Sequence, residues 1–291
     1  MHMLFHIQNQ FLNVSVSDRG AELMSIRGCG GTEYLWQGDP EYWSDRAPNI
    51  FPYVARLTEG SYTYGGKTYQ LPIHGFAPTA LYAVTEHTDD SVTFTLEDTP
   101  EFYVMYPFRF RFSIRYELDG QDLHVHLSVE NRDEKTMYFG LGGHPGINVP
   151  LEPSLKFEDY FLQFPPCGLR RVEFTESCFI TGGEDSFPLE NHRLPLRHDM
   201  FDQDAIVLKG VPGRVTLASD KGSKSVTLSA PDLGVFGFWH WPRTDAPYIC
   251  LEPWSSLPSR QDVVEDLQTQ PDLISLDAGK TYRTTWSLEI R

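Results

Sequence analysis

The chain has 291 residues and carries 24 Lys and Arg against 40 Asp and Glu, which gives a formal net charge of −16. A field of that sign repels nucleic acid and anionic membrane surfaces, so we expect neither as a partner and expect neutral ligands instead. A chain of this length can bury a substantial core, and we expect residues 1–291 to form a single domain.

The four cysteines are scattered along the chain without a CxxC pair, at Cys29, Cys167, Cys178 and Cys250. Such spacing in a chain this long is typical of free, mostly buried thiols in a reducing compartment. The first residues lack a basic segment followed by an apolar one, and no apolar run approaches a membrane span. We therefore expect a cytoplasmic protein, a monomer or a homodimer.

The chain reads as a succession of β-strands in chain order. Short runs rich in Val, Ile, Thr, Tyr and Phe lie between Gly, Asp, Asn and Pro. The runs that predict strands are 62–69 (a hairpin), 91–96, 109–116, 123–129, 214–217, 225–228, 248–251 and 280–290. The turn at Asp119-Gly120 joins two of them into a hairpin. The plausible helices are short, for example 261–267. Many antiparallel strands with few helices predict an all-β fold, a large antiparallel β-sandwich of two packed sheets.

Two histidines are distinguished by their neighbours. His74 lies in Leu71-Pro72-Ile73-His74-Gly75, and His144 lies in Gly142-Gly143-His144-Pro145-Gly146. Proline stiffens the backbone and glycine lets a ligand approach closely. Imidazole can give or take a proton near neutral pH. The structural alternatives are a strand-capping role for His74 and an ordinary turn position for His144.

A glutamate ends the buried-looking strand Tyr248-Ile249-Cys250-Leu251 and is followed by Pro253-Trp254. A carboxylate in that setting, Glu252, is costly unless it is paired or used, because burial penalises its charged form. The structural alternative is a salt bridge, most plausibly to an arginine such as Arg56. Two histidines and one carboxylate together are the parts of a proton-transfer site for a polyol.

Other residue patterns give weaker evidence for a functional site. The aromatic residues near these motifs are mostly core by base rates, although one or two could stack on a sugar ring; they are Phe51, Tyr53, Phe76, Trp239, Trp241 and Trp254. His124 and His126 share a strand face without a third ligand, so we expect no metal. No P-loop, GxGxxG, GxSxG or HExxH motif is present, and we expect no cofactor.

Four motifs in order resemble the galactose mutarotase (aldose 1-epimerase) superfamily, most closely its LacX-like branch, over nearly the whole length. They are Asn49-Ile50-Phe51-Pro52 through Arg56, Gly66-Lys67-Thr68-Tyr69 with His74-Gly75-Phe76-Ala77, Gly142-Gly143-His144-Pro145, and Leu251-Glu252-Pro253-Trp254 after Trp241. The resemblance implies a β-supersandwich and an isomerase that interconverts sugar anomers without a cofactor.

The resemblance also implies a role for each matching residue. His144 is expected to be the general acid that protonates the ring oxygen, and Glu252 the general base that takes the proton of the anomeric hydroxyl. His74 and Arg56 are expected to hold the sugar and polarise its oxygens. Family members carry an aspartate that bonds the sugar, which Asp204 matches best, with Asp202 as the competing position. Phe76 and Trp241 complete the expected sugar contacts.

Two positions depart from the branch pattern. Pro78 stands where an arginine is usual, and Ala55 replaces the glycine before Arg56. Both positions bear on which sugar is recognised. Two alternative hypotheses of function remain. The first is a non-catalytic carbohydrate-binding or sensor protein on the same fold, and the second is a mutarotase for hexose 6-phosphates. The second requires a basic cluster, for which the candidates are Arg170, Arg171, Arg193 and Arg197. An inverting glycosidase lacks a convincing second carboxylate.

Overall fold

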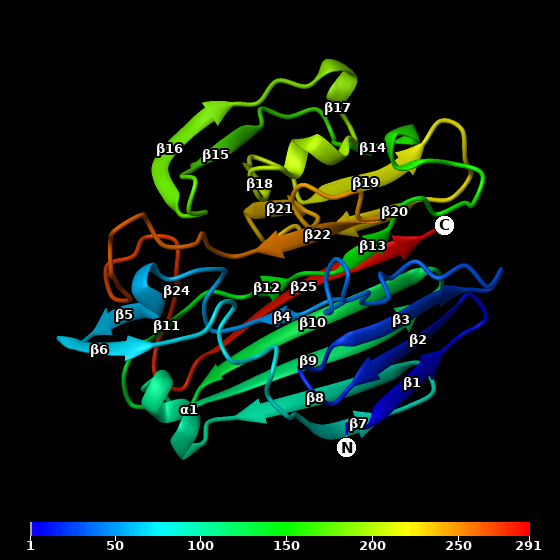
Figure 1. The fold of residues 1–291 in the computed structure, drawn as a ribbon. Coiled ribbons are helices and arrows are strands. Elements are labelled where there is room, and N and C mark those ends of the chain that lie inside the picture. Colours follow the sequence, from blue (N-terminus) through cyan, green and yellow to red (C-terminus); the bar gives the residue numbers. More distant parts are fainter. Residues whose placement is uncertain (1) are drawn as a thin grey trace.

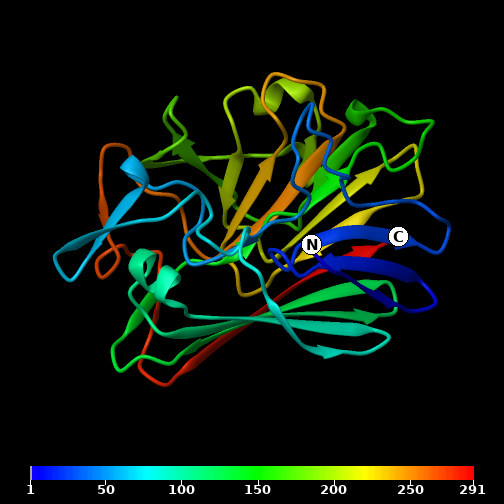
Figure 2. The same ribbon diagram turned by 60° about the horizontal axis from the view of Figure 1, so that its bottom comes forward.

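The computed structural model describes residues 2–291. Two large antiparallel sheets lie one over the other, and the chain passes from one sheet to the other several times (Figures 1 and 2). The first sheet has nine strands in the order β17-β14-β19-β20-β25-β10-β9-β8-β7. Its members are β7 (Ala83–His87), β8 (Ser91–Glu97), β9 (Phe110–Asp119), β10 (Asp122–Asn131), β14 (Tyr160–Gln163), β17 (Arg193–Pro195), β19 (Arg214–Ser219), β20 (Val226–Ser229) and β25 (Thr281–Ile290).

The second large sheet contains the strand that carries Glu252 and the two strands that flank His144. Its strands follow the order β16-β15-β18-β21-β22-β12-β4, and β13 pairs with β22 beside β12. Its members are β4 (Asn49–Ile50), β12 (Gly142–Gly143), β13 (Gly146–Asn148), β15 (Arg170–Phe174), β16 (Ile180–Ser186), β18 (Ile206–Lys209), β21 (Val235–Trp239) and β22 (Tyr248–Trp254). All seven side chains of β22 are buried, which places its middle residues deep in the molecule.

Three small sheets and a few short helices complete the fold. The small sheets contain β1 (Leu4–Gln8), β2 (Leu12–Ser17) and β3 (Leu23–Gly28); β5 (Ser61–Tyr64), β6 (Lys67–Gln70) and β23 (Glu265–Asp266); and β11 (Met137–Phe139) with β24 (Ile274–Leu276). The helices are α1 (Pro100–Met105) and the 3₁₀ turns η1 (Thr58–Gly60), η2 (Phe157–Asp159), η3 (Glu190–His192) and η4 (His198–Phe201). None of the helices in residues 2–291 has the length and apolar character needed to cross a bilayer.

The alternating sequence of β9 explains its two faces. Phe110, Phe112 and Ile114 are fully buried. On the opposite face, Arg111 forms an ion pair with Glu97 of β8, and Arg115 forms one with Glu117 of the same strand. Successive side chains of a strand point to opposite faces, so period-two hydrophobicity buries one face. The predicted β-sandwich and the predicted hairpin through Asp119-Gly120 are confirmed.

The prediction of a helix over 261–267 is wrong. This segment contains turns and the short strand β23, which pairs in parallel with β5. Asp262 has a φ of 57°, which a helix does not allow. The Glu265 carboxylate accepts hydrogen bonds from the backbone N–H and the guanidinium of Arg260, and these contacts stabilise the turn instead.

A helical turn that the alternation did not predict lies at Pro100–Met105. Thr99 caps it, because its hydroxyl accepts a hydrogen bond from the backbone N–H of Phe102, and proline occupies the first helical turn. The cysteines are all free, as expected, but only Cys250 is buried and Cys29 is exposed. The expectation of mostly buried thiols is therefore corrected.

Candidate active site

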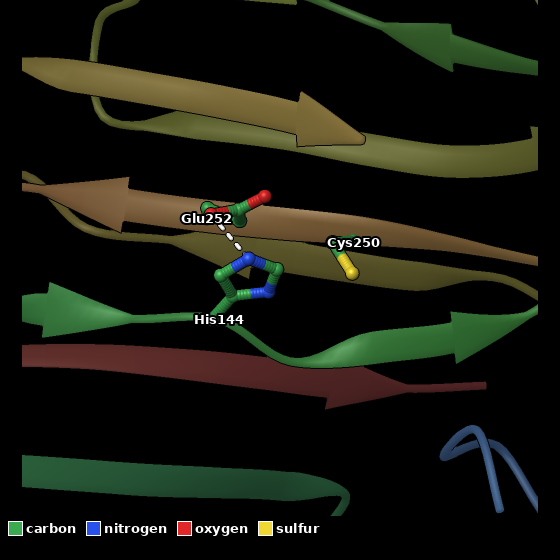
Figure 3. A group of neighbouring side chains, drawn as sticks. All are labelled: His144, Cys250 and Glu252. Atoms are coloured by element: carbon green, nitrogen blue, oxygen red, sulfur yellow. Dashed lines mark ion pairs between the residues drawn. The ribbon is translucent and has the colours of Figure 1, made fainter. Parts of the chain in front are cut away.

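The centre of the site is a buried pair formed by His144 and Glu252. His144 lies between β12 and β13, which both pair with β22, Gly142 opposite Trp254 and Gly146 opposite Cys250. This antiparallel register places position 144 opposite Glu252. Figure 3 shows the imidazole directed at the carboxylate, with Nε2 at 3.1 Å from Oε2. The partner of Glu252 is therefore a histidine and not the arginine that the sequence left open.

Burial sets the protonation of the pair. Glu252 is 1% exposed and His144 is 8% exposed. Burial, with a smaller contribution from Asp204, raises the pKa of Glu252 well above its ordinary value. Burial, with a contribution from His74, lowers the pKa of His144 well below 6.5. Both directions penalise charge, so the two groups hold one proton between them and titrate together.

The pair has unused hydrogen-bonding capacity. Within residues 2–291, neither Nδ1 of His144 nor Oε2 of Glu252 makes a hydrogen bond of good geometry, although both atoms are buried. A buried polar atom without a partner costs about 1–3 kcal/mol. Such atoms persist at sites where a ligand supplies the missing partner, and a polyol offers hydroxyls that both donate and accept.

The glycines before His144 let it sit deep in the sandwich. A Cβ atom on Gly143 would lie 2.7 Å from the ring of Trp286 on β25, and one on Gly142 would lie 2.4 Å from the carbonyl oxygen of Pro253. Real side-chain atoms do not approach so closely. Gly143 therefore allows close approach to the facing sheet, and Gly142 allows close approach to the paired strand β22, which the sequence motif alone did not show.

His74 is clamped beside the pair by the segment that carries Arg56. The backbone N–H of His74 donates to the carbonyl oxygen of Ala55 at 3.0 Å, and the Ala55 N–H donates to Nδ1 of His74 at 3.3 Å. Since Nδ1 accepts, the proton of the neutral ring lies on Nε2. Burial lowers the pKa of His74 to about 4. The ring lies 5.3 Å from the ring of His144, centroid to centroid, and is a neutral donor in the site.

Ala55 is one of the two departures from the branch pattern, and its backbone conformation is one that glycine adopts more easily. Its φ is 55°, in the left-handed region where a Cβ atom is strained and where glycine is free. We expect Ala55→Gly to raise the free energy of unfolding by about 0.5 kcal/mol, because about 1–2 kcal/mol of strain is removed and part is lost to the greater entropy of unfolded glycine.

The control for this prediction is Ala205→Gly. Ala205 is also partly buried against the same small apolar cluster but has no positive φ. Its replacement should lower the free energy of unfolding by about 0.5–1 kcal/mol. Urea unfolding of the three proteins measures both changes, and equal losses in the two variants would contradict the strain at position 55.

Arg56 and Asp204 form an ion pair in the lining of a cleft. Nη2 of Arg56 lies 3.4 Å from Oδ2 of Asp204, and the other carboxylate oxygen accepts the backbone N–H of Ala205 at 2.9 Å. Asp202 lines the same cleft, and within residues 2–291 it forms no ion pair with Arg56. The geometry therefore favours Asp204 over Asp202 as the carboxylate next to the pair.

Aromatic rings form a wall around His144. Trp43 lies 5.0 Å from the imidazole and Trp239 lies 5.7 Å from it, centroid to centroid. Trp43 was missed in the sequence, where it lies with Tyr42 in the polar loop Gly38-Asp39-Pro40-Glu41-Tyr42-Trp43. Two adjacent aromatic residues in a polar loop were the available signal, since such residues at a surface often contact a ligand.

The structure separates the two aromatic residues expected to contact a ligand. Trp241 is 45% exposed and lines the cleft. Phe76 is 2% exposed and stacks on Phe102 and Phe110 in the main core. The expectation for Phe76 is corrected, because its ring packs among the aromatic residues of the main core and does not line the cleft.

Cys250 is the third polar side chain at the pair. Donor atoms of His144, Cys250 and Glu252 lie within 4.8 Å of one another, and Figure 3 shows the thiol on β22 beside the imidazole. Nitrogen, sulfur and oxygen donors are ligands that Zn²⁺ accepts. Burial raises the pKa of the Cys250 thiol well above its usual range, which opposes the thiolate that a metal binds.

Comparisons with known proteins identify the family of the chain. The sequence profile of the family described as aldose 1-epimerase matches residues 3–289. The plasmid and chromosomal forms of protein LacX of Lactococcus lactis subsp. lactis are each 32% identical over 292 residues, covering 96% of this chain and 97% of the relative. The expected resemblance to the LacX branch is confirmed.

Solved structures share the fold. A galactose mutarotase related enzyme from Lactobacillus acidophilus superposes with a TM-score of 0.94 at 34% identity, covering 99% of this chain and 97% of that chain. A galactose mutarotase-like protein from Lactobacillus casei ATCC 334 gives a TM-score of 0.94 at 32% identity, covering 99% of this chain and 100% of that chain.

Proposed function

The chain belongs to the aldose 1-epimerase family, and we propose that it is itself an aldose 1-epimerase, an isomerase that interconverts the α and β anomers of a neutral hexose. The observation that carries the proposal is the buried contact between His144 Nε2 and Glu252 Oε2 at 3.1 Å. Opening a hemiacetal requires one proton delivered and one removed at neighbouring oxygens. A pair that shares one proton supplies both functions, whereas a protein that only binds sugar has no need of them.

The proposed reaction balances without another reactant. In the reactive state the shared proton is on His144, which gives it to the ring oxygen while Glu252 takes the proton of the anomeric hydroxyl. The bond between C1 and the ring oxygen breaks, and C1 becomes an aldehyde. Rotation about C1–C2 presents the other carbonyl face. The ring hydroxyl returns its proton to His144 as it attacks C1, and Glu252 returns its proton to the carbonyl oxygen.

The surrounding residues hold the sugar in this proposal. His74 presents a neutral N–H to a ring or hydroxyl oxygen, because its Nδ1 is occupied by the Ala55 N–H. Arg56 donates to a sugar hydroxyl while Asp204 fixes the guanidinium. Trp239 and Trp43 enclose the ring and exclude water, which strengthens the hydrogen bonds made inside.

Charge favours a neutral sugar over a sugar phosphate. The cleft is lined by three arginines, Arg56, Arg171 and Arg243, against five carboxylates, Glu173, Glu176, Asp185, Asp202 and Asp204. Arg56 is engaged by Asp204. A phosphate dianion in such a cleft meets net repulsion, whereas hydroxyls accept and donate hydrogen bonds without that cost.

The pH profile tests the protonation of the pair. Because burial lowers the pKa of His144 well below 6.5, the pair does not take up a second proton near that pH. We expect kcat/KM to stay constant from pH 7.5 down through pH 6.5 and to fall only at lower pH. Polarimetry with the buffer-catalysed rate subtracted measures this, and an acid limb centred near 6.5 would contradict the buried pair.

The direct test is the approach of fresh α-D-glucose and α-D-galactose to anomeric equilibrium, followed by polarimetry. We expect the wild-type protein to accelerate at least one of them in proportion to enzyme concentration. Saturable binding of both sugars without any acceleration would instead establish a binding protein. Acceleration only of hexose 6-phosphates would overturn the argument from cleft charge.

A further inference from the structure

Trp254 lies two residues after Glu252 on β22, and its indole N–H is buried without a partner. The side chain is 4% exposed, and within residues 2–291 its Nε1 makes no hydrogen bond of good geometry. Oε2 of Glu252 is also buried without such a bond. A buried polar atom that lacks a partner destabilises the folded protein. A donor and an acceptor left in this state so close along one strand indicate a role beyond packing.

The two side chains lie on the same face of β22. Successive side chains of a strand point to opposite faces. Ile249 and Leu251 belong to the main core, whereas Cys250 and Trp254 belong to two smaller clusters. Positions 250, 252 and 254 therefore share the face that is turned away from the main core, and this places the indole next to the carboxylate.

The indole acts on the charge of Glu252. Burial raises the pKa of this carboxyl group, Asp204 raises it further, and hydrogen bonding by the Trp254 side chain opposes both. A donor that lowers the pKa of an acid stabilises the charged form of that acid. The N–H therefore lies within reach of the carboxylate, although the two groups are not aligned in a well-formed hydrogen bond.

Glycines on the two neighbouring strands fix the position of the indole. A Cβ atom on Gly142 of β12 would lie 2.9 Å from Cδ1 of Trp254, and one on Gly237 of β21 would lie 3.0 Å from Cζ2. Gly142 pairs with Trp254, and Gly237 pairs with Glu252. Cδ1 and Cζ2 lie on the indole edge that carries Nε1. This edge therefore extends across β22 toward the level of Glu252, and larger residues at the two glycines would displace it.

Stabilisation of a charged Glu252 matters for the reaction proposed above. In the reactive state His144 holds the shared proton and Glu252 is negative, yet burial opposes that charge. An N–H donor offsets part of this cost, because hydrogen bonds to charged groups are about twice as strong as those between neutral groups. The structural alternative is that the ring only fills the small apolar cluster that it shares with Ile50, Val207 and Val235.

We propose that Trp254 is a positioning residue for Glu252. Its indole N–H donates to one carboxylate oxygen when Glu252 is charged and leaves the other oxygen to accept the proton of the anomeric hydroxyl. The part of this proposal that concerns catalysis rests on the function proposed above. The hydrogen bond itself does not depend on whether a sugar is isomerised.

The test replaces Trp254 with benzothienylalanine, which keeps the shape of tryptophan but has sulfur in place of the N–H. We expect kcat for mutarotation to fall about tenfold and KM to change by less than about twofold, because only the charged state of Glu252 loses a hydrogen bond. Trp254→Phe should lower kcat in the same way. The control is the same replacement at Trp286, whose N–H is also buried and unpartnered within residues 2–291 but lies in the main core. It should keep its kcat.

The titration of Glu252 separates a hydrogen bond from packing. The ionisable groups around this carboxyl are His144, Asp204, Cys250 and Tyr248, and the replacement at position 254 leaves all four in place. Without the donor the charged form is less stable, so Glu252 should lose its proton about one pH unit higher, which corresponds to the tenfold loss. Infrared absorption of the protonated carboxyl group, assigned by its disappearance in Glu252→Gln, measures this without any sugar.

An unshifted titration of Glu252 in the benzothienylalanine protein would overturn the hydrogen bond, even if kcat fell, because the loss would then come from packing. A shifted titration with unchanged kcat would refute the positioning role. If the wild-type protein isomerises no sugar, the catalytic proposal fails, and the titration alone then supports or refutes the hydrogen bond between Trp254 and Glu252.

Discussion

Glu252→Gln should lower kcat for mutarotation by about 10²- to 10⁴-fold while the protein stays folded. The carboxamide has the shape of the carboxylic acid but cannot accept the anomeric proton. Glu252 is 1% exposed, and burial raises its pKa, so the neutral side chain adds no cost of burying charge. We expect the midpoint of thermal unfolding not to fall. Polarimetry and calorimetry of the same preparation measure the two quantities.

The matched control is Glu265→Gln. Glu265 is also buried, at 4% exposed, but its carboxylate accepts hydrogen bonds from Arg260 and lies outside the cleft lining. This variant should lose about 1–3 kcal/mol of stability and keep its kcat. Unchanged mutarotation in a folded Glu252→Gln protein would refute the proposed base.

A second variant tests whether the pair acts as a unit. His144→Gln removes the proposed acid and should lower kcat by a similar factor. The variant carrying both replacements should be little worse than either alone, because groups that share one reaction step lose their effect together. Multiplicative losses would show that the two side chains act independently and would contradict the shared proton.

Gly75→Ala should cost about 3 kcal/mol or more of folding stability and should also lower activity. Gly75 has a φ of 74°, and a Cβ atom there would lie 2.2 Å from the carbonyl oxygen of Phe51. That carbonyl accepts the N–H of Ala77, and the N–H of Phe51 donates to the carbonyl oxygen of His74. The clash therefore pushes apart the two segments that hold His74 and Arg56 in place. Urea unfolding and polarimetry measure the two losses.

Gly66→Ala separates the clash from backbone strain. Gly66 has the same φ of 74°, but a Cβ atom at this hairpin turn would meet nothing within 4 Å. The variant should lose only about 1–2 kcal/mol, which is the cost of the left-handed conformation itself. Similar stabilities for the two variants would mean that the Phe51 backbone can move away, and the tight clamp on His74 would be refuted.

Much of the fold could be predicted because it follows from local pattern. The alternation in β9 and β10 fixes which residues face the core, since successive side chains of a strand point to opposite faces. The helix predicted over 261–267 was wrong, because contacts beyond the local hydrophobic pattern decide the structure of this segment. Its helix-like composition is overridden by the pairing of β23 with β5, a contact between distant segments that no local window contains. The hydrogen bonds of Glu265 to Arg260, just before the segment, stabilise the turn.

The candidate site divides in the same way. His74 and His144 each lie beside glycine and proline, and Glu252 lies inside an apolar strand. Such choices are costly for folding stability, so the sequence alone indicates a functional site at these residues. Resemblance to a known family added the roles. Phe76 shows the limit of motif position, because its side chain is 2% exposed and packs in the main core although it lies two residues after His74.

The sequence by itself determined the all-β class and indicated His74, His144 and Glu252 as candidate site residues, because each depends on backbone preference or on the cost of burying a polar group locally. Only the tertiary structure decided that β12, β13 and β22 bring His144 to 3.1 Å from Glu252, that Arg56 pairs with Asp204, and that Trp239 and Trp241 line an extended cleft. Those contacts depend on strand register and sheet packing between distant segments, which the local sequence does not encode.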